Sequence, residues 1–122
     1  MPNPVVHFEL LGKKPKRLRD FYSTVFDWKL TPIKGIDYAL VNPGEKKGIN
    51  GGIGEINDEL PKPIGVAIYI EVKNPAAMLK SITKAGGKVI LPVTKIPGMI
   101  TYALFEDPEG NVVGIVDEKI PK

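Results

Sequence analysis

The chain repeats one pattern after about 60 residues, and this repeat limits its possible folds more than any other feature. Two segments alternate like strands with one apolar face, at Val6, Phe8 and Leu10 and again at Val66, Ile68 and Ile70. Pro15 and Pro75 stand at the same spacing, each in the first turn of a predicted helix. Tyr-Ala-Leu recurs at 38–40 and 102–104. The sequence therefore predicts two copies of a β-α-β-β-β unit, with module one at about 4–58 and module two at about 64–118.

Each predicted helix has an apolar stripe at helical spacing. The stripes are Leu18, Phe21, Tyr22 and Val25 in the first helix and Met78, Leu79, Ile82 and Ala85 in the second. Gly86-Gly87 is expected to end the second helix. The strand that begins at Lys88 is expected to end at Pro92, since proline interrupts a regular strand. The remaining strands are expected at 5–11, 28–30, 38–41, 48–55, 66–72, 101–105 and 111–116.

These elements define an α+β fold within one domain covering residues 1–122. One module has a single helix over a short sheet. We therefore expect the two modules to form a curved, mostly antiparallel eight-stranded sheet with the helices on its outer, apolar face. The inner face would then be concave and carry His7, Glu9, Tyr69 and Glu71. Concave surfaces with a few polar groups bind small molecules.

Composition excludes several classes of function. The chain has no cysteine, which excludes disulfides, thiolate metal sites and cysteine nucleophiles. No run approaches the ~20 apolar residues of a membrane span, and the first residues do not resemble a signal peptide, so we expect a cytoplasmic protein without a membrane partner. The absence of glutamine and the many lysines, isoleucines and prolines favour a thermophile.

The net charge of +3 includes one dense basic cluster, made of Lys13, Lys14, Lys16, Arg17 and Arg19. It lies at the start of the first predicted helix and carries no recognised nucleic-acid motif. Charge runs usually lie on solvated faces. We therefore interpret the cluster as a solvent-exposed face and expect no nucleic-acid partner.

The paired modules resemble the vicinal oxygen chelate superfamily, which includes glyoxalase I, extradiol dioxygenases and bleomycin-resistance proteins. The resemblance rests on the opening strand with His7, on Phe21-Tyr22 and on the turn Asp107-Pro108-Glu109-Gly110-Asn111. The stretches 48–52 and 96–98 are similar to the small lactoylglutathione lyase-related subgroup. The resemblance implies a homodimer and leaves a lyase or dioxygenase-like activity open.

In metal-dependent members of that superfamily, His, Gln or Glu ligands come from the first and last strands of each module. His7 stands at the first of these positions, but the repeat places Ala67 at the second. The third ligand normally follows the Asp-Pro-x-Gly-Asn turn by three residues, which is Gly114 here. Matching Asn50 with Asn111 puts Ile53 at the fourth position, with Glu55 two residues on. A divalent ion needs three or more protein ligands. We therefore expect no metal centre and no cofactor.

The candidate ligand contacts are His7, Glu9, Tyr38 and Tyr69. The leading hypothesis is a protein that binds a small organic molecule in the concave face. One alternative is a metal-dependent lyase or isomerase that uses His7 with a non-standard carboxylate such as Glu55 or Glu71. The other is a subunit that docks on a larger protein. For His7, the sole histidine, a structural role, a ligand contact and general-base catalysis all remain open.

Overall fold

The computed structural model describes residues 2–42, 44, 47–98 and 100–117. The elements are β1 (Val5–Gly12), α1 (Pro15–Phe26), β2 (Lys29–Pro32), β3 (Tyr38–Asn42), β4 (Gly51–Glu55), β5 (Val66–Glu71), α2 (Pro75–Lys84), β6 (Lys88–Ile96), β7 (Ile100–Glu106) and β8 (Val112–Val116). The order β-α-β-β-β occurs twice, as the repeat predicts. Neither helix has the length and apolar run needed to cross a bilayer in the described part of the chain.

The chain divides into two compact units. The N-terminal unit holds residues 6–59 and 63–67, and the C-terminal unit holds 2–5, 60–62 and 68–117 of the described residues. Their strands are ordered β2-β3-β4-β1 and β6-β7-β8-β5, so the two units share one topology. In each unit the first and last strands pair in parallel and the other pairs are antiparallel. The sheet is therefore mixed and mostly antiparallel, and the α+β class is confirmed.

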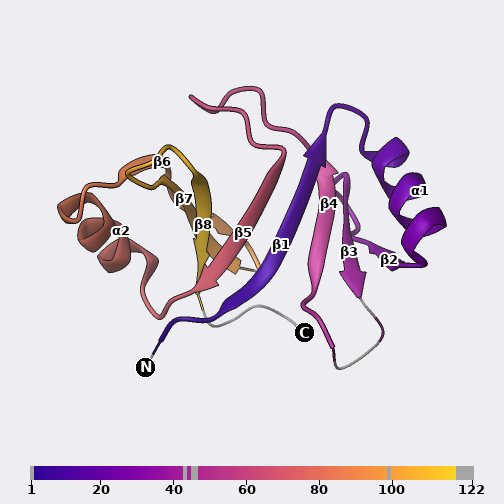
Figure 1. Cartoon of the computed structure of the whole chain (residues 1–122), viewed down its shortest axis with the longest axis horizontal. Helices are drawn as coiled ribbons and strands as arrows, with labels where there is room; N and C mark the ends of the chain where they lie inside the picture. Colours follow the sequence, from indigo (N-terminus) through magenta and orange to yellow (C-terminus); the bar gives the residue numbers. More distant parts are fainter. Residues whose placement is uncertain (1, 43, 45–46, 99, 118–122) are drawn as a thin grey trace. The chain divides into compact units, whose positions relative to one another are not determined.

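In the N-terminal unit, α1 packs against β2 and β4 (Figure 1). An aromatic cluster fills the space between the helix and the sheet. The ring of Tyr22 stacks on Trp28 at 5.1 Å, and Phe8 meets Trp28 at 5.4 Å. A Cβ at Gly51 would overlap the Phe8 ring, so this glycine lets the ring lie flat on β4. The predicted apolar face of β1 is thus the face that α1 covers.

In the C-terminal unit, α2 packs against β6 and β7 (Figure 1). Asn74 caps the helix, because its Oδ1 accepts a 3.1 Å hydrogen bond from the N–H of Ala77. The helix gives way to Gly86, whose φ of +105° favours glycine. The core consists of Val72, Leu79, Ala103 and Ile115, with Ile70, Met78, Ile82 and Phe105 packed around them.

The turn before β8 is held by one carboxylate. Asp107 accepts 2.9 Å hydrogen bonds from the N–H groups of Glu109 and Asn111 and from the Asn111 side chain. The Asn111 side chain and main chain hold the pKa of Asp107 below its ordinary value. The composition of this segment predicts the turn, and its hydrogen bonds fix where β8 begins.

Two strand boundaries predicted from the sequence are wrong by more than two residues. The first is the start of β4, which lies at Gly51 instead of at residue 48. The second is the end of β6, since this strand does not end at Pro92 but continues to Ile96. The register between β6 and β7 shifts twice between Val89 and Thr94, around this proline. A bulge leaves a strand residue without a ladder partner, so proline loses no hydrogen bond there.

Candidate functional site

His7 and Glu9 lie on the face of β1 opposite α1. Successive strand residues point to opposite faces, and Phe8 between them packs on the helix side. The neighbouring strand β4 leaves space on this face, because Gly52 pairs with Glu9 and has no side chain. The Tyr38 ring, at the start of β3, fills that space: a Cβ at Gly52 or Gly54 would overlap it. The side chains of His7, Glu9 and Tyr38 thus lie on one face of the sheet, next to two glycines of β4.

These three side chains form a chain of hydrogen bonds. The Tyr38 hydroxyl donates to Oε2 of Glu9 at 2.9 Å, and Nε2 of His7 lies 2.9 Å from the same hydroxyl. A phenol has one proton, so the hydroxyl that donates to Glu9 must accept from His7. The network therefore assigns the imidazole proton to Nε2.

Burial also decides the charge of His7. Desolvation lowers its pKa from 6.5 to about 4, so the imidazole is neutral at pH 7. A neutral ring protonated at Nε2 carries its lone pair on Nδ1. In chemical terms, Nδ1 can accept a hydrogen bond or a proton, while Tyr38 links the ring to a carboxylate.

Tyr69 lies in the C-terminal unit, on the face of β5 opposite Ile70 and the α2 core. Its ring lies over Gly114 in β8, where a Cβ would overlap it. The side chain is only 6% exposed, and its ring centroid is 6.3 Å from that of Tyr102. Tyr69 and Tyr38 therefore have the same local setting, each ring over a glycine of the last strand of its module. A role of Tyr69 in ligand binding stays a prediction.

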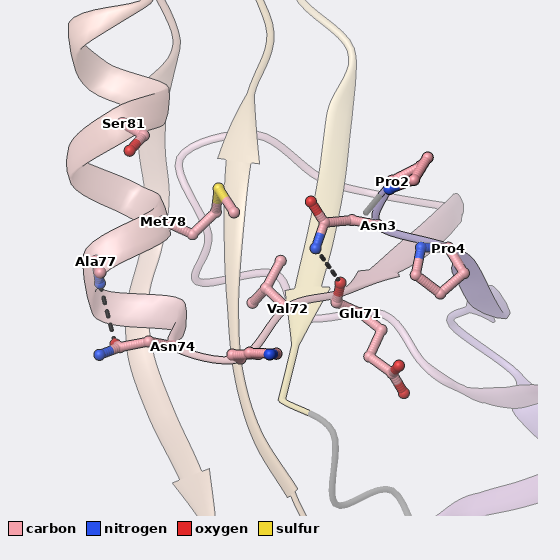
Figure 2. Close-up of a pocket in the computed structure, with 10 residues that line it drawn as sticks. Pro2, Asn3, Pro4, Glu71, Val72, Asn74, Ala77, Met78 and Ser81 are labelled. Atoms are coloured by element: carbon pink, nitrogen blue, oxygen red, sulfur yellow. Dashed lines mark hydrogen bonds between the residues drawn. The ribbon is translucent and has the colours of Figure 1, made fainter.

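Glu71 lines a groove of about 540 Å³ between α2 and the N-terminal residues (Figure 2). Its main chain is fixed there, since its N–H donates to the carbonyl of Pro4 at 2.9 Å and its carbonyl accepts from Asn3 at 3.0 Å. Figure 2 shows its carboxylate turned away from Val72 and Met78. The main chain of Glu71 thus borders this groove, and its carboxylate points elsewhere.

The strand register corrects one of the positions taken from the resemblance. Gly52 pairs with Glu9 and Gly114 pairs with Tyr69, and Glu9 and Tyr69 are equivalent in the repeat. The counterpart of Gly114 is therefore Gly52 rather than Ile53. A shift of one residue moves a side chain to the other face. Accordingly Ile53 is fully buried, at 0% exposure, on the α1 side.

Glu55 shares the face of Ile53, two residues further along β4. It pairs with Gly12, which packs against Leu18 of α1. Glu55 therefore lies on the opposite face from His7, and the hypothesis of a metal held by these two residues is wrong.

The residues at the four ligand positions taken from the resemblance do not form a site for a divalent metal ion. The four corresponding positions carry His7, Ala67, Gly52 and Gly114, of which only the histidine has a donor atom. In each unit a tyrosine ring occupies the space above the glycine. Among the residues that the structure describes, no three His, Asp or Glu side chains are grouped closely enough to hold an ion.

Comparison with known proteins now gives the family. The sequence model of the Glyoxalase/Bleomycin resistance protein/Dioxygenase superfamily matches residues 5–115. The chain belongs to this superfamily. It is also 32% identical over 114 residues to a glyoxylase-like domain-containing protein of Didymella fabae, an alignment that covers 88% of each chain.

Solved structures have the same fold. One is the hypothetical protein BH1468 of Bacillus halodurans C-125, with a TM-score of 0.72, 16% identity and coverage of 100% of this chain and 99% of that one. Another is a superfamily member from Vibrio splendidus 12B01, with a TM-score of 0.65, 14% identity and coverage of 96% and 100%. At these identities the likeness concerns the fold alone.

Sequence reasoning named His7, Glu9 and Tyr38 separately, and the structure joins them. The sequence feature that could have predicted this contact is the pair Gly52 and Gly54, two glycines on the same face of one strand. Such a pair leaves one face of the strand bare, and a large neighbouring side chain can then cross it. The reach of Tyr38 to Glu9 across β4 follows from this space.

Proposed function

We propose that this protein binds a small organic molecule on the face of the N-terminal unit opposite α1, with His7, Glu9 and Tyr38 as contacts and without a metal ion. The hydrogen-bonded chain of these three residues carries the proposal. The proposed role is binding, with catalysis left to the alternative tested below.

The burial of His7 in a hydrogen-bonded network supports a functional role for this residue. Desolvation by burial lowers its pKa from 6.5 to about 4. This setting costs stability below pH 6.5, where the unfolded chain binds a proton that the folded chain does not, and perturbed groups of this kind gather at functional sites. The network also holds all three side chains in place before a ligand arrives, which lowers the entropic cost of binding.

The donor set supports binding without metal. A divalent ion bound to Nε2 of His7 would have to displace the Tyr38 hydroxyl from that nitrogen. It would also find no donor atom at Gly52, which has no side chain. The competing function is a metal-dependent lyase or isomerase. Calorimetric titration with Ni²⁺, Zn²⁺, Mn²⁺ and Fe²⁺ separates the two. We expect no tight stoichiometric binding; tight binding that is lost in His7→Ala would favour the enzyme.

Ligand binding is tested by screening small organic molecules while the NMR signals of His7 are observed. Because the chain has one histidine, these signals report on this site alone. Tyr38→Phe keeps the ring over Gly52 but removes the hydroxyl, so a hit should bind about tenfold more weakly.

The matched control for this screen is Tyr22→Phe, which removes a hydroxyl on the α1 side and should leave binding unchanged. Equal losses in both variants would contradict the proposal. If no compound moves the His7 signals, the alternative of a protein-interaction subunit is favoured instead.

The proposal includes a homodimer in the cytoplasm, with Tyr69 as a further contact to the ligand. The support for the dimer is the family to which the chain belongs. Sedimentation equilibrium tests the dimer, and a mass equal to one chain across micromolar concentrations would contradict it.

Tyr69→Leu, which removes the aromatic ring of the proposed contact, should weaken the binding of any compound found in the screen.

A further inference from the structure

A second surface of the N-terminal unit combines positive charge with exposed aromatic carbon. It is a groove of about 520 Å³ beside the first turns of α1, lined by Gly12, Lys13, Lys14, Arg17, Leu18, Phe21 and Tyr22. We call it the α1 groove. It lies on the helix side of the sheet and so is separate from the His7 face.

The charges of the α1 groove are not neutralised within the described part of the chain. Lys16 pairs with Asp20 at 3.2 Å and Arg19 pairs with Asp37 at 2.9 Å, but Lys13, Lys14 and Arg17 form no ion pair there. The basic cluster thus splits into two cations that have carboxylate partners and three that line the groove. Three such cations together match a ligand with several negative charges.

The wall of the groove supplies an apolar surface. Phe21 is 54% exposed although it is part of the apolar stripe of α1. Its ring meets Tyr22 edge to face at 5.0 Å, and Tyr22 is in turn stacked on Trp28. Phe21 is therefore held in position by the aromatic cluster while more than half of it stays in contact with water. Such a ring favours stacking with a flat ligand ring.

We infer that the α1 groove binds a nucleoside polyphosphate, with the phosphates on Lys13, Lys14 and Arg17 and the base against Phe21. A single carboxylate or phosphate would leave most of the three positive charges uncompensated. A polyphosphate neutralises all three, and arginine and lysine are the residues that hold phosphate oxygens. A volume of about 520 Å³ is in the range of small-molecule sites.

The test is isothermal titration of the protein with ATP, in parallel with adenosine and with inorganic tripolyphosphate. ATP should bind at least about tenfold more tightly than either, because each control lacks one half of the recognition. Equal affinity for ATP and tripolyphosphate would overturn the inference, since charge alone would then explain binding. A short oligoadenylate without a terminal polyphosphate should bind more weakly; if it binds as tightly as ATP, a single-stranded nucleic acid is the ligand.

Variants locate the site. Lys14→Gln and Arg17→Gln should each weaken ATP binding about five- to tenfold. Lys16→Gln removes the same charge from a neighbouring position of the chain but outside the groove, so it should change the affinity less than twofold. Phe21→Ser should weaken ATP about tenfold and leave tripolyphosphate unchanged. An equal effect of Lys16→Gln and Lys14→Gln would overturn the inference.

Discussion

The ring of Tyr69 lies over Gly114, so that a Cβ on this glycine would overlap the ring. Tyr38 has the same relation to Gly52 in the other module. Both glycines stand where the resemblance to metal-dependent relatives expects a metal ligand. The loss of the donor side chain and the presence of the tyrosine ring therefore go together, since each ring needs the space that the missing side chain leaves.

This relationship predicts that Gly114→Ala destabilises the protein. Tyr69 is buried and cannot move out of the way, so the added methyl group should cost about 1–3 kcal/mol in the free energy of unfolding. Urea denaturation measures this. Gly65→Ala is the control, because a Cβ there would lie 3.8 Å from the nearest heavy atom, the Leu11 carbonyl oxygen. Two variants of equal stability would show that the Tyr69 ring does not depend on the glycine.

The second prediction concerns the titration of His7. Because desolvation lowers its pKa to about 4, its imidazole signals should titrate near that value instead of near 6.5. The nitrogen shifts at pH 7 should show a neutral ring protonated at Nε2, as the bond to Tyr38 requires. A proton NMR titration of the single histidine measures both, and a midpoint near 6.5 would mean that the ring is solvated.

The third prediction is the pH dependence of stability that follows from this pKa. Between pH 6.5 and 4 the unfolded chain binds a proton at His7 and the folded chain does not. The contribution of His7 to stability is therefore complete above pH 6.5 and declines as the pH falls towards 4. Since one pKa unit corresponds to about 1.4 kcal/mol, the whole decline should amount to roughly 3–4 kcal/mol.

This third prediction is measured as a difference between two proteins. Unfolding free energies of the wild type and of His7→Gln are compared at several pH values, so that the carboxylates, which titrate in both, cancel. The difference should change only between pH 6.5 and 4. A constant difference across this range would show that His7 has the same pKa in both states.

The fourth prediction compares how much an apolar side chain of each helix contributes to stability. Leu79 of α2 is 8% exposed in the core of the C-terminal unit, whereas Val25 of α1 is 55% exposed. Leu79→Ala should cost about 2–4 kcal/mol, and Val25→Ala less than about 1 kcal/mol. Thermal and urea unfolding measure both. A large loss for Val25→Ala would indicate that a partner or a second copy covers α1 in solution.

The sequence by itself determined the twofold β-α-β-β-β order, the apolar face of β1 and the turn at Asp107. These features follow from local rules: strand and helix periods, proline and glycine positions, and side chains that bond to their own turn. The predicted apolar face of β5 is wrong in part, since Val66 and Ile68 are exposed and only Ile70 packs on the α2 core. Local rules do not predict how exposed Phe21 and Val25 are. Their spacing indicates an apolar helix stripe, but only packing decides how much of that stripe the sheet covers.

Only the tertiary structure decided the site. Whether position 52 or 53 corresponds to Gly114 depends on strand register, and register comes from hydrogen bonds between segments far apart in sequence. The same register separated Glu55 from His7 and brought Tyr38 across Gly52 to join His7 with Glu9. The pKa of His7 likewise depends on what surrounds the ring, because desolvation comes from packing and not from residue type.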